Sequence, residues 1–160
     1  MYLWVVWLHF AFAFFVAVSY NRYTGSRQSW VQMKGDNNLK LNNDCVRDIL
    51  LTLEEICTYD SSFSYDMDND KPHLLTPYTH DEILYHVNQC RMANLIIDVH
   101  FYDGGDSFDI GDLSPSGHQY LANIRSDKIW NKTKKVASEI GVNSLSAMTQ
   151  ISTQIISSII

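Results

Sequence analysis

The stretch Thr79–Leu113 constrains the fold most, because it predicts one helix followed directly by a two-stranded β-hairpin. Thr79 and Glu82 have the spacing of a capping box, in which each side chain accepts the main-chain N–H of the other residue. Apolar residues then recur every three or four positions, as on the buried side of an amphipathic helix: Ile83, Leu84, Val87 and Cys90. Asn94, which tolerates a left-handed backbone, marks the expected end of this helix.

The residues after Asn94 alternate between apolar and polar side chains, which is the pattern of a half-buried strand. Ile97, Val99 and Phe101 form the apolar set. Residues 103–106, Asp-Gly-Gly-Asp, form a turn sequence, and Phe108 continues the alternation on a return strand. A helix that leads into a hairpin is the second half of a winged helix. The sequence therefore predicts an α+β, winged-helix-like domain with a two-stranded wing.

Helices are also predicted on both sides of this stretch. The first begins at Asn43 as N-cap and carries an apolar stripe: Val46, Ile49, Leu50, Leu53, Ile56 and Cys57. The polar, turn-rich residues 58–78 leave room near their end for one short helix or strand. Further helices are expected from Tyr120 and from Asp127, the second ending at Gly141. Its inward-facing residues are expected to be Ile129, Trp130, Thr133, Val136, Ala137 and Ile140. The uncharged helix Asn143–Ile160 is expected to pack on its own domain or to form a homodimer with a second copy.

Composition limits the size and the partners of the domain. With 160 residues, 46% of them hydrophobic, the chain is long enough for one compact domain with an appendage. Its net charge of −6 disfavours non-specific coating of nucleic acid, which depends on neutralising phosphates. The three cysteines, Cys45, Cys57 and Cys90, lack the spacing of a metal site or a disulfide framework. They predict reduced, buried thiols and a cytoplasmic protein.

An apolar, uncharged leader, Tyr2–Tyr20, precedes the predicted domain. As a helix it would span roughly 28 Å, which suits a membrane anchor that leaves the domain in the cytoplasm. Residues 1–32 contain no Ile, Lys, Asp or Glu, and this break in composition favours Met33 as the true start. A soluble, packed segment is the third alternative. The expected divisions are the leader, residues 1–32; the winged-helix-like domain, residues 33–126; and a C-terminal helical extension, residues 127–160.

Several ordered motifs carry a resemblance to a known family: KLNNDCVRDILLTLEE at residues 40–55, EILYH at 82–86, ANLI at 93–96, and GHQYLANIR at 117–125 followed by Ile129-Trp130. Over about residues 33–160 the chain resembles the bacterial and prophage family known as domain of unknown function 2513. The resemblance implies a small winged-helix-like domain with C-terminal helices, carried in phage and bacterial genomes. It implies no biochemical activity. Asn94 stands where the family pattern has glycine, and the loop of residues 58–70 is unusually long and acidic.

No motif for catalysis or for a cofactor is evident. Asp66, Asp68 and Asp70 have the first spacings of a calcium loop, but Lys71 replaces the required Gly, so a solvated acidic loop is expected. His86 and Cys90 lie one helical turn apart without a second ligand pair, which favours a buried thiol beside a half-buried imidazole over a metal site. No nucleophile is placed against a base. We therefore predict a protein that is not an enzyme and that has neither cofactor nor metal.

Two functions remain, DNA-binding regulation and protein–protein interaction with, for example, a host partner of a phage. The predicted contact residues for either partner are Tyr85, Asn88, Gln89, Arg91, Lys128, Lys132 and Lys135. Asn88 and Gln89 suit adenine in the major groove, and the lysines suit phosphates. Asp81 and Glu82 oppose DNA binding, whereas an exposed Tyr85 or Tyr102 would suit a protein partner. A continuous positive surface that joins the helix to the Lys128–Lys135 segment would favour DNA, which we rank narrowly first.

Overall fold

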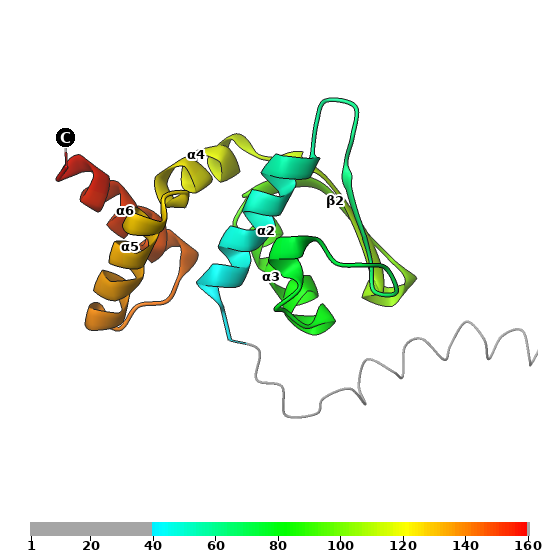
Figure 1. Cartoon of the computed structure of the whole chain (residues 1–160), viewed down its shortest axis with the longest axis horizontal. Helices are drawn as coiled ribbons and strands as arrows, with labels where there is room; N and C mark the ends of the chain where they lie inside the picture. Colours follow the sequence, from blue (N-terminus) through cyan, green and yellow to red (C-terminus); the bar gives the residue numbers. More distant parts are fainter. Residues whose placement is uncertain (1–39, 160) are drawn as a thin grey trace, which may run out of the picture. The chain divides into compact units, whose positions relative to one another are not determined.

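Two helices lie against one face of a three-stranded antiparallel sheet in the computed structural model, which describes residues 40–159 (Figure 1). The chain runs through α2 (Asn43–Ile56), β1 (Phe63–Asp66), the 3₁₀ turn η1 (His73–Leu75), α3 (His80–Met92), β2 (Ile96–Tyr102), the 3₁₀ turn η2 (Asp103–Gly105) and β3 (Ser107–Leu113). Three further helices follow: α4 (Pro115–Ile124), α5 (Asp127–Ile140) and α6 (Leu145–Ser157). The predicted α+β class is confirmed. The leader and Met33 lie outside the described residues.

The sheet has one strand more than the sequence predicts. Its order is β1-β3-β2, so that β3 pairs with both neighbours, and β1 comes from the segment predicted to be a polar loop. Phe63 and Tyr65 are buried on the inner face opposite Ile110 and Phe108. The alternation that marks this strand is only four residues long and lies among turn residues. Its pairing with β3, a contact distant in sequence, makes it a strand.

The start and the end of α3 agree with the sequence. The Thr79 main-chain N–H donates to Glu82 Oε2 over 2.9 Å, and the Glu82 N–H donates to Thr79 Oγ1 over 3.3 Å, so the predicted capping box is present. Asn94 has φ 54°, and the next N–H, of Leu95, bonds back to the Cys90 carbonyl at 2.9 Å. The buried stripe differs at one position, because His86 is buried whereas Leu84 is half-buried.

The predicted start of α2 is wrong by one residue. The N-cap is Asn42, whose Oδ1 accepts the N–H of Asp44 at 3.0 Å, and Asn43 is the first helical residue. Both are asparagines followed by the same apolar stripe, so the spacing does not distinguish them. The stripe itself is confirmed for Val46, Ile49, Leu50 and Leu53, which are buried, whereas Ile56 and Cys57 are half-buried.

One core of buried side chains extends from α2 to α6. α6 packs on α5 and α4 and buries Met148, Ile151 and Ile155 within the chain, so a second copy is not required to cover them. Ile156 is half-buried. Ile140 was expected to face inward, yet 61% of its surface is exposed because it lies in the last turn of α5, just before Gly141 ends the helix with φ 72°.

A glycine lets α4 begin directly against the end of α3. A Cβ on Gly117 would lie 2.0 Å from the Leu95 carbonyl oxygen, so no larger residue fits. Ser114 completes this junction: its hydroxyl donates to the Asn94 carbonyl and accepts the Gly117 N–H at 2.9 Å, and its own N–H donates to the Leu95 carbonyl at 2.9 Å. The turn after α3 thus fixes where the C-terminal helices start.

His86 joins α3 to the start of α2. Its Nε2 accepts the Asn42 N–H at 2.8 Å, and its Nδ1 lies 2.6 Å from the Glu82 carbonyl oxygen, to which it donates. Only a neutral ring, protonated at Nδ1, satisfies both bonds. Burial is the largest influence and lowers the pKa of His86 below its usual value, although the Glu82 carbonyl opposes this effect.

We predict that Gly117→Ala will destabilise the protein by about 3 kcal/mol or prevent folding, because the new methyl group must displace backbone. The measurement is the midpoint and free energy of chemical unfolding. Ser116→Ala, on the exposed neighbouring position of α4, should stay within about 0.5 kcal/mol of wild type. Equal stability of the two variants would contradict the close approach.

We also predict that the free energy of unfolding decreases as pH is lowered from 7.5 to 5.5. The unfolded chain binds a proton at His86 near a pKa of about 6.5, whereas the folded chain resists protonation, so stability is complete above that pH and lost below it. Urea titrations at several pH values measure this decrease. His86→Gln should be less stable at high pH but should show a flatter dependence; parallel curves for the two proteins would show that another group is responsible.

Candidate interaction surfaces

The residues predicted to contact a partner on α3 lie away from the core, but they are not equally available. Arg91 is exposed, and its Nε and Nη2 donate to Asn88 Oδ1 at 3.2 and 3.0 Å, so the Asn88 oxygen already has partners. Tyr85 is half-buried, with its ring edge-on to the His86 ring at a centroid distance of 5.0 Å. Gln89 is half-buried, and its side chain makes no hydrogen bond to another residue within 40–159.

The predicted basic segment of α5 is partly neutralised. Lys128, Lys132 and Lys135 are exposed. Lys134, which lies in the same segment, instead donates to both carboxylate oxygens of Asp44, at 2.8 and 3.1 Å. Arg125 pairs with Glu54 on α2 at 2.5 Å. Three lysines of the predicted basic segment therefore remain for a partner.

Asp44 organises the contact between α2 and α5. Its Oδ1 accepts the indole N–H of buried Trp130 at 2.7 Å as well as the Lys134 ammonium group. Arg47, one turn later, donates to the Ile124 carbonyl at 3.0 Å and to Asp127 at 2.7 Å. Partial burial raises the pKa of the Asp44 carboxyl, but the bonds from Lys134 and Trp130 outweigh burial and hold it below the usual value. The carboxylate therefore stays charged at neutral pH.

The two predicted contact surfaces lie on different helices, α3 and α5. α3 packs on α2 and β2, whereas α5 packs on α6 and α4. The side of α2 that faces α5 contributes Asp44, and Asp48 on the same helix accepts the Tyr78 hydroxyl at 2.6 Å. α2, which packs on α3 and pairs with α5 through Asp44, therefore carries carboxylates near both predicted contact surfaces.

The region around the sheet is strongly acidic. Residues 58–113 contain two Lys or Arg residues, Lys71 and Arg91. Their Asp and Glu residues number eleven: Asp60, Asp66, Asp68, Asp70, Asp81, Glu82, Asp98, Asp103, Asp106, Asp109 and Asp112. The Lys71 ammonium group donates a hydrogen bond to the Tyr78 carbonyl oxygen at 2.7 Å. The ion pairs found within residues 40–159 all join α2 to α4, α5 or the turn between them, so none neutralises this region.

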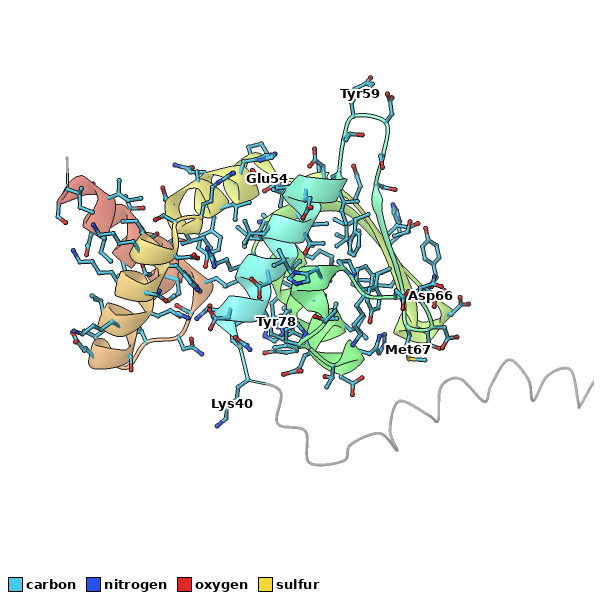
Figure 2. All side chains as sticks on the ribbon, viewed as in Figure 1. Lys40, Glu54, Tyr59, Asp66, Met67 and Tyr78 are labelled. Atoms are coloured by element: carbon cyan, nitrogen blue, oxygen red, sulfur yellow. The ribbon has the colours of Figure 1, made fainter. Side chains whose placement is uncertain are left out.

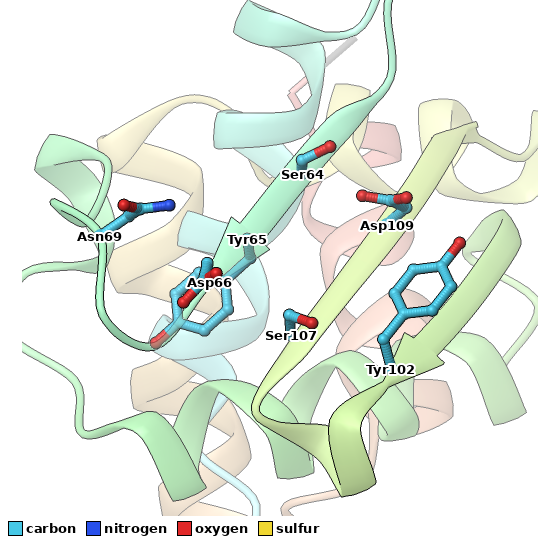
Figure 3. A pocket seen from close by; sticks show the side chains of 7 residues that line it. All are labelled: Ser64, Tyr65, Asp66, Asn69, Tyr102, Ser107 and Asp109. Atoms are coloured by element: carbon cyan, nitrogen blue, oxygen red, sulfur yellow. The ribbon is translucent and has the colours of Figure 1, made fainter.

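The outer face of the sheet carries these charges in cross-strand rows. Asp109 lies between Ser64 and His100, and in the next row Ser107 lies between Asp66 and Tyr102. Figure 3 shows the Asp109 carboxylate and the Tyr102 hydroxyl on this face. Together these side chains line a shallow recess of about 260 Å³: Ser64, Tyr65, Asp66, Asn69, Tyr102, Ser107 and Asp109. We call these residues other than the inward-facing Tyr65, together with the η2 turn, the acidic sheet face.

The wing turn extends the acidic sheet face beyond the strands. Asp103 and Gly104 adopt φ values of 49° and 74°, as expected for the predicted Asp-Gly-Gly-Asp turn. Asp103 and Asp106 are exposed at this end. The Met67 N–H donates to the Asp106 carbonyl at 3.0 Å, and Figure 2 shows Asp66 and Met67 together where β1 ends.

Sequence reasoning did not identify the acidic sheet face, because it depends on β1. The short alternation Phe63-Ser64-Tyr65-Asp66 is the signal that could have indicated a strand with Ser64 and Asp66 on its outer side. Tyr102 was predicted to be exposed, and 47% of its surface is accessible. Ile97 and Phe101, which were predicted to form the apolar side of a half-buried strand, are exposed.

Residues 40–159 contain no group of three or more His, Cys, Asp and Glu side chains placed to hold a metal. Both ring nitrogens of His86 are engaged, and burial raises the pKa of the Cys90 thiol to about 12. Asp66 Oδ1 accepts the Asp68 N–H at 2.9 Å, as in an ordinary turn. The three cysteines are free thiols; Cys45 and Cys90 are buried and Cys57 is half-buried.

None of the helices from α2 to α6 combines the length and apolar character that a membrane span needs. No curated protein and no solved structure matches the chain. A family match covers residues 40–143, which is about two thirds of the chain and includes every element from α2 to α5. The expected resemblance is thereby confirmed: the chain belongs to the family described as hypothetical protein (DUF2513).

Proposed function

We propose that the protein is a winged-helix-type interaction module that binds a cationic protein partner through the acidic sheet face. Its topology supports the winged-helix assignment. The order α2, β1, η1, α3, β2, β3, with strands arranged β1-β3-β2, is that of a winged helix in which η1 replaces the second helix. The free thiols favour the cytoplasm as its location.

The observation that carries the proposal is the sign of the charge where a winged helix usually meets its partner. The first turn of α3 carries Asp81 and Glu82, and the wing carries Asp103 and Asp106. Phosphates approaching the first turn of α3 or the wing would meet these carboxylates, whereas the exposed cation of α3, Arg91, lies in its last turn. Affinity for a duplex depends on neutralising phosphates. A lysine- or arginine-rich protein surface would instead be attracted.

DNA binding is the second candidate, because Lys128, Lys132 and Lys135 are exposed on one helix. In that case Gln89 and the Asn88–Arg91 pair on α3 would read bases. The lysines on α5 would then contact phosphates while α3 contacts bases, yet α2, which packs on α3 and pairs with α5, contributes the carboxylates of Asp44 and Asp48. This geometry supports DNA binding less well than it supports a cationic protein partner.

We predict that the full chain, kept in solution by a mild detergent, captures a protein from a bacterial lysate and releases it as salt is raised. Asp106→Asn with Asp109→Asn should abolish capture, because these changes remove two charges from the acidic sheet face and preserve shape. The matched control is Glu55→Gln with Glu139→Gln, which removes two exposed charges from α2 and α5. Capture is measured by quantitative mass spectrometry, and equal loss in both double variants would contradict the proposal.

DNA binding, the second candidate, is tested by measuring how tightly the same preparation binds a duplex DNA fragment as the salt concentration is raised. The proposal expects no saturable binding to the duplex at physiological salt. Tight binding that weakens in Lys132→Ala and Lys135→Ala, with Gln89→Ala losing about 1–3 kcal/mol of discrimination at one base pair, would establish DNA as the partner. Loss confined to Tyr85→Ala, without salt dependence, would indicate an apolar protein contact through α3 instead.

A further inference from the structure

β2 forms one edge of the sheet, and in the described chain it pairs only with β3. Its side chains are unusually apolar for an open edge. Phe101 and Tyr102 keep 39% and 47% of their surfaces exposed, and Ile97 keeps 43%. β2 contains no lysine and no proline, the residues that commonly prevent an edge strand from pairing. The strand is therefore open to a further strand.

The hydrogen-bond register shows which main-chain groups of β2 face this open edge. The bond from the Met67 N–H to the Asp106 carbonyl places these two residues opposite each other in a hydrogen-bonded pair. Alternation along an antiparallel ladder then directs Ser107 and Asp109 toward β2, where they oppose Tyr102 and His100. The intervening residues of β2, Val99 and Phe101, consequently direct their N–H and C=O groups outward.

The stretch available to a partner strand is limited at one end by a kink. Asp98 has φ 53°, and a Cβ on the opposing Gly111 would lie 2.8 Å from Asp98 Cβ. This left-handed residue interrupts the regular alternation of outward main-chain groups along the open edge, although β2 pairs with β3 on both sides of it. The usable edge is therefore Val99–Tyr102, which spans roughly 13 Å at about 3.3 Å per residue.

We propose, resting on the function proposed above, that the cationic partner binds by adding an extended segment to β2 as a fourth strand. Its main chain pairs with the outward groups of Val99 and Phe101. Its alternate side chains lie beside Val99 and Phe101 on the inner face, where apolar residues fit, and beside His100 and Tyr102 on the outer face. Asp109 lies on β3 directly beyond His100, and its carboxylate attracts a lysine or arginine side chain that extends across His100.

The charge of this edge also decides between a foreign segment and a second copy of the chain. Two copies paired through β2 would bring the carboxylates of Asp98, Asp103 and Asp109 toward the same carboxylates of the other copy. Like charges that face each other across strands are destabilising. A segment with alternating basic and apolar residues meets no such repulsion.

The probe for this proposal is a blocked eight-residue peptide that alternates lysine and valine, titrated against the full chain in detergent. Two isomers carry N-methyl groups, either on all valines or on all lysines. Strand addition uses the N–H groups of only one of these sets. One isomer should therefore bind like the parent peptide, and the other should lose roughly tenfold or more in affinity, because two or more hydrogen bonds are blocked.

Protein variants test the same edge from the other side. Val99→Pro removes an outward N–H without breaking the ladder to β3. This variant should bind the parent peptide with roughly tenfold lower affinity. Val99→Ala keeps that N–H and should lose clearly less affinity. Circular dichroism checks that both variants are folded. If Val99→Pro does not fold, the two methylated isomers still decide the question.

Each outcome separates strand addition from the function on which it rests. Equal binding of both methylated isomers, lost in Asp106→Asn with Asp109→Asn, would overturn strand addition but leave an acidic surface that binds cations. No binding of the parent peptide, or equal binding of a peptide with glutamate in place of lysine, would overturn the proposed addition of a cationic strand. Whether the proposed function also fails is then decided by protein capture from lysate, which does not depend on β2.

Discussion

The Asp44 carboxylate is the group on which the arrangement of this protein depends most. It lies in the first turn of α2 and accepts hydrogen bonds from the Trp130 indole and the Lys134 ammonium group. A buried indole N–H without a partner would cost roughly 1–3 kcal/mol, so this bond helps determine where α5 docks. Lys134, Arg47 and Arg125 pair with carboxylates of α2 and α5, so these three cations do not neutralise the carboxylates of the sheet.

Sequence patterns predicted those parts of the fold that local chemistry controls. The Thr79–Glu82 capping box, the left-handed Asn94 and the Gly141 helix end each involve residues within a few positions of one another, and all three are present. Features that depend on distant contacts were not predicted. β1 is a strand because it pairs with β3, and Gly117 is required because the Leu95 carbonyl lies against it. Neither partner can be identified by spacing alone.

The residues of the candidate interaction surfaces likewise include some that local patterns predict and some that depend on distant contacts. Helical periodicity correctly placed Gln89 and Arg91 outside the core, and the exposure of Lys128, Lys132 and Lys135 follows from the same rule. The pairing of Lys134 with Asp44, ninety positions earlier, does not follow from any local rule. The acidic sheet face requires the register of three strands, which brings Asp66 of β1 and Asp109 of β3 onto one surface. A count of charges along the chain shows the excess of acid but not the surface on which it collects.

The kink at Asp98 limits how much of the apolar edge strand β2 can pair with a further strand. A long, flat edge such as an unbroken β2 would pair with any exposed strand, including that of another copy. The left-handed Asp98, accommodated by the missing side chain of Gly111, shortens the regular edge to Val99–Tyr102. The carboxylates around this short segment repel copies of the chain and attract basic segments. A shorter edge forms fewer main-chain hydrogen bonds and therefore binds any added strand less tightly. The carboxylates raise the affinity again for basic segments only, so the short edge and its charge together produce specificity.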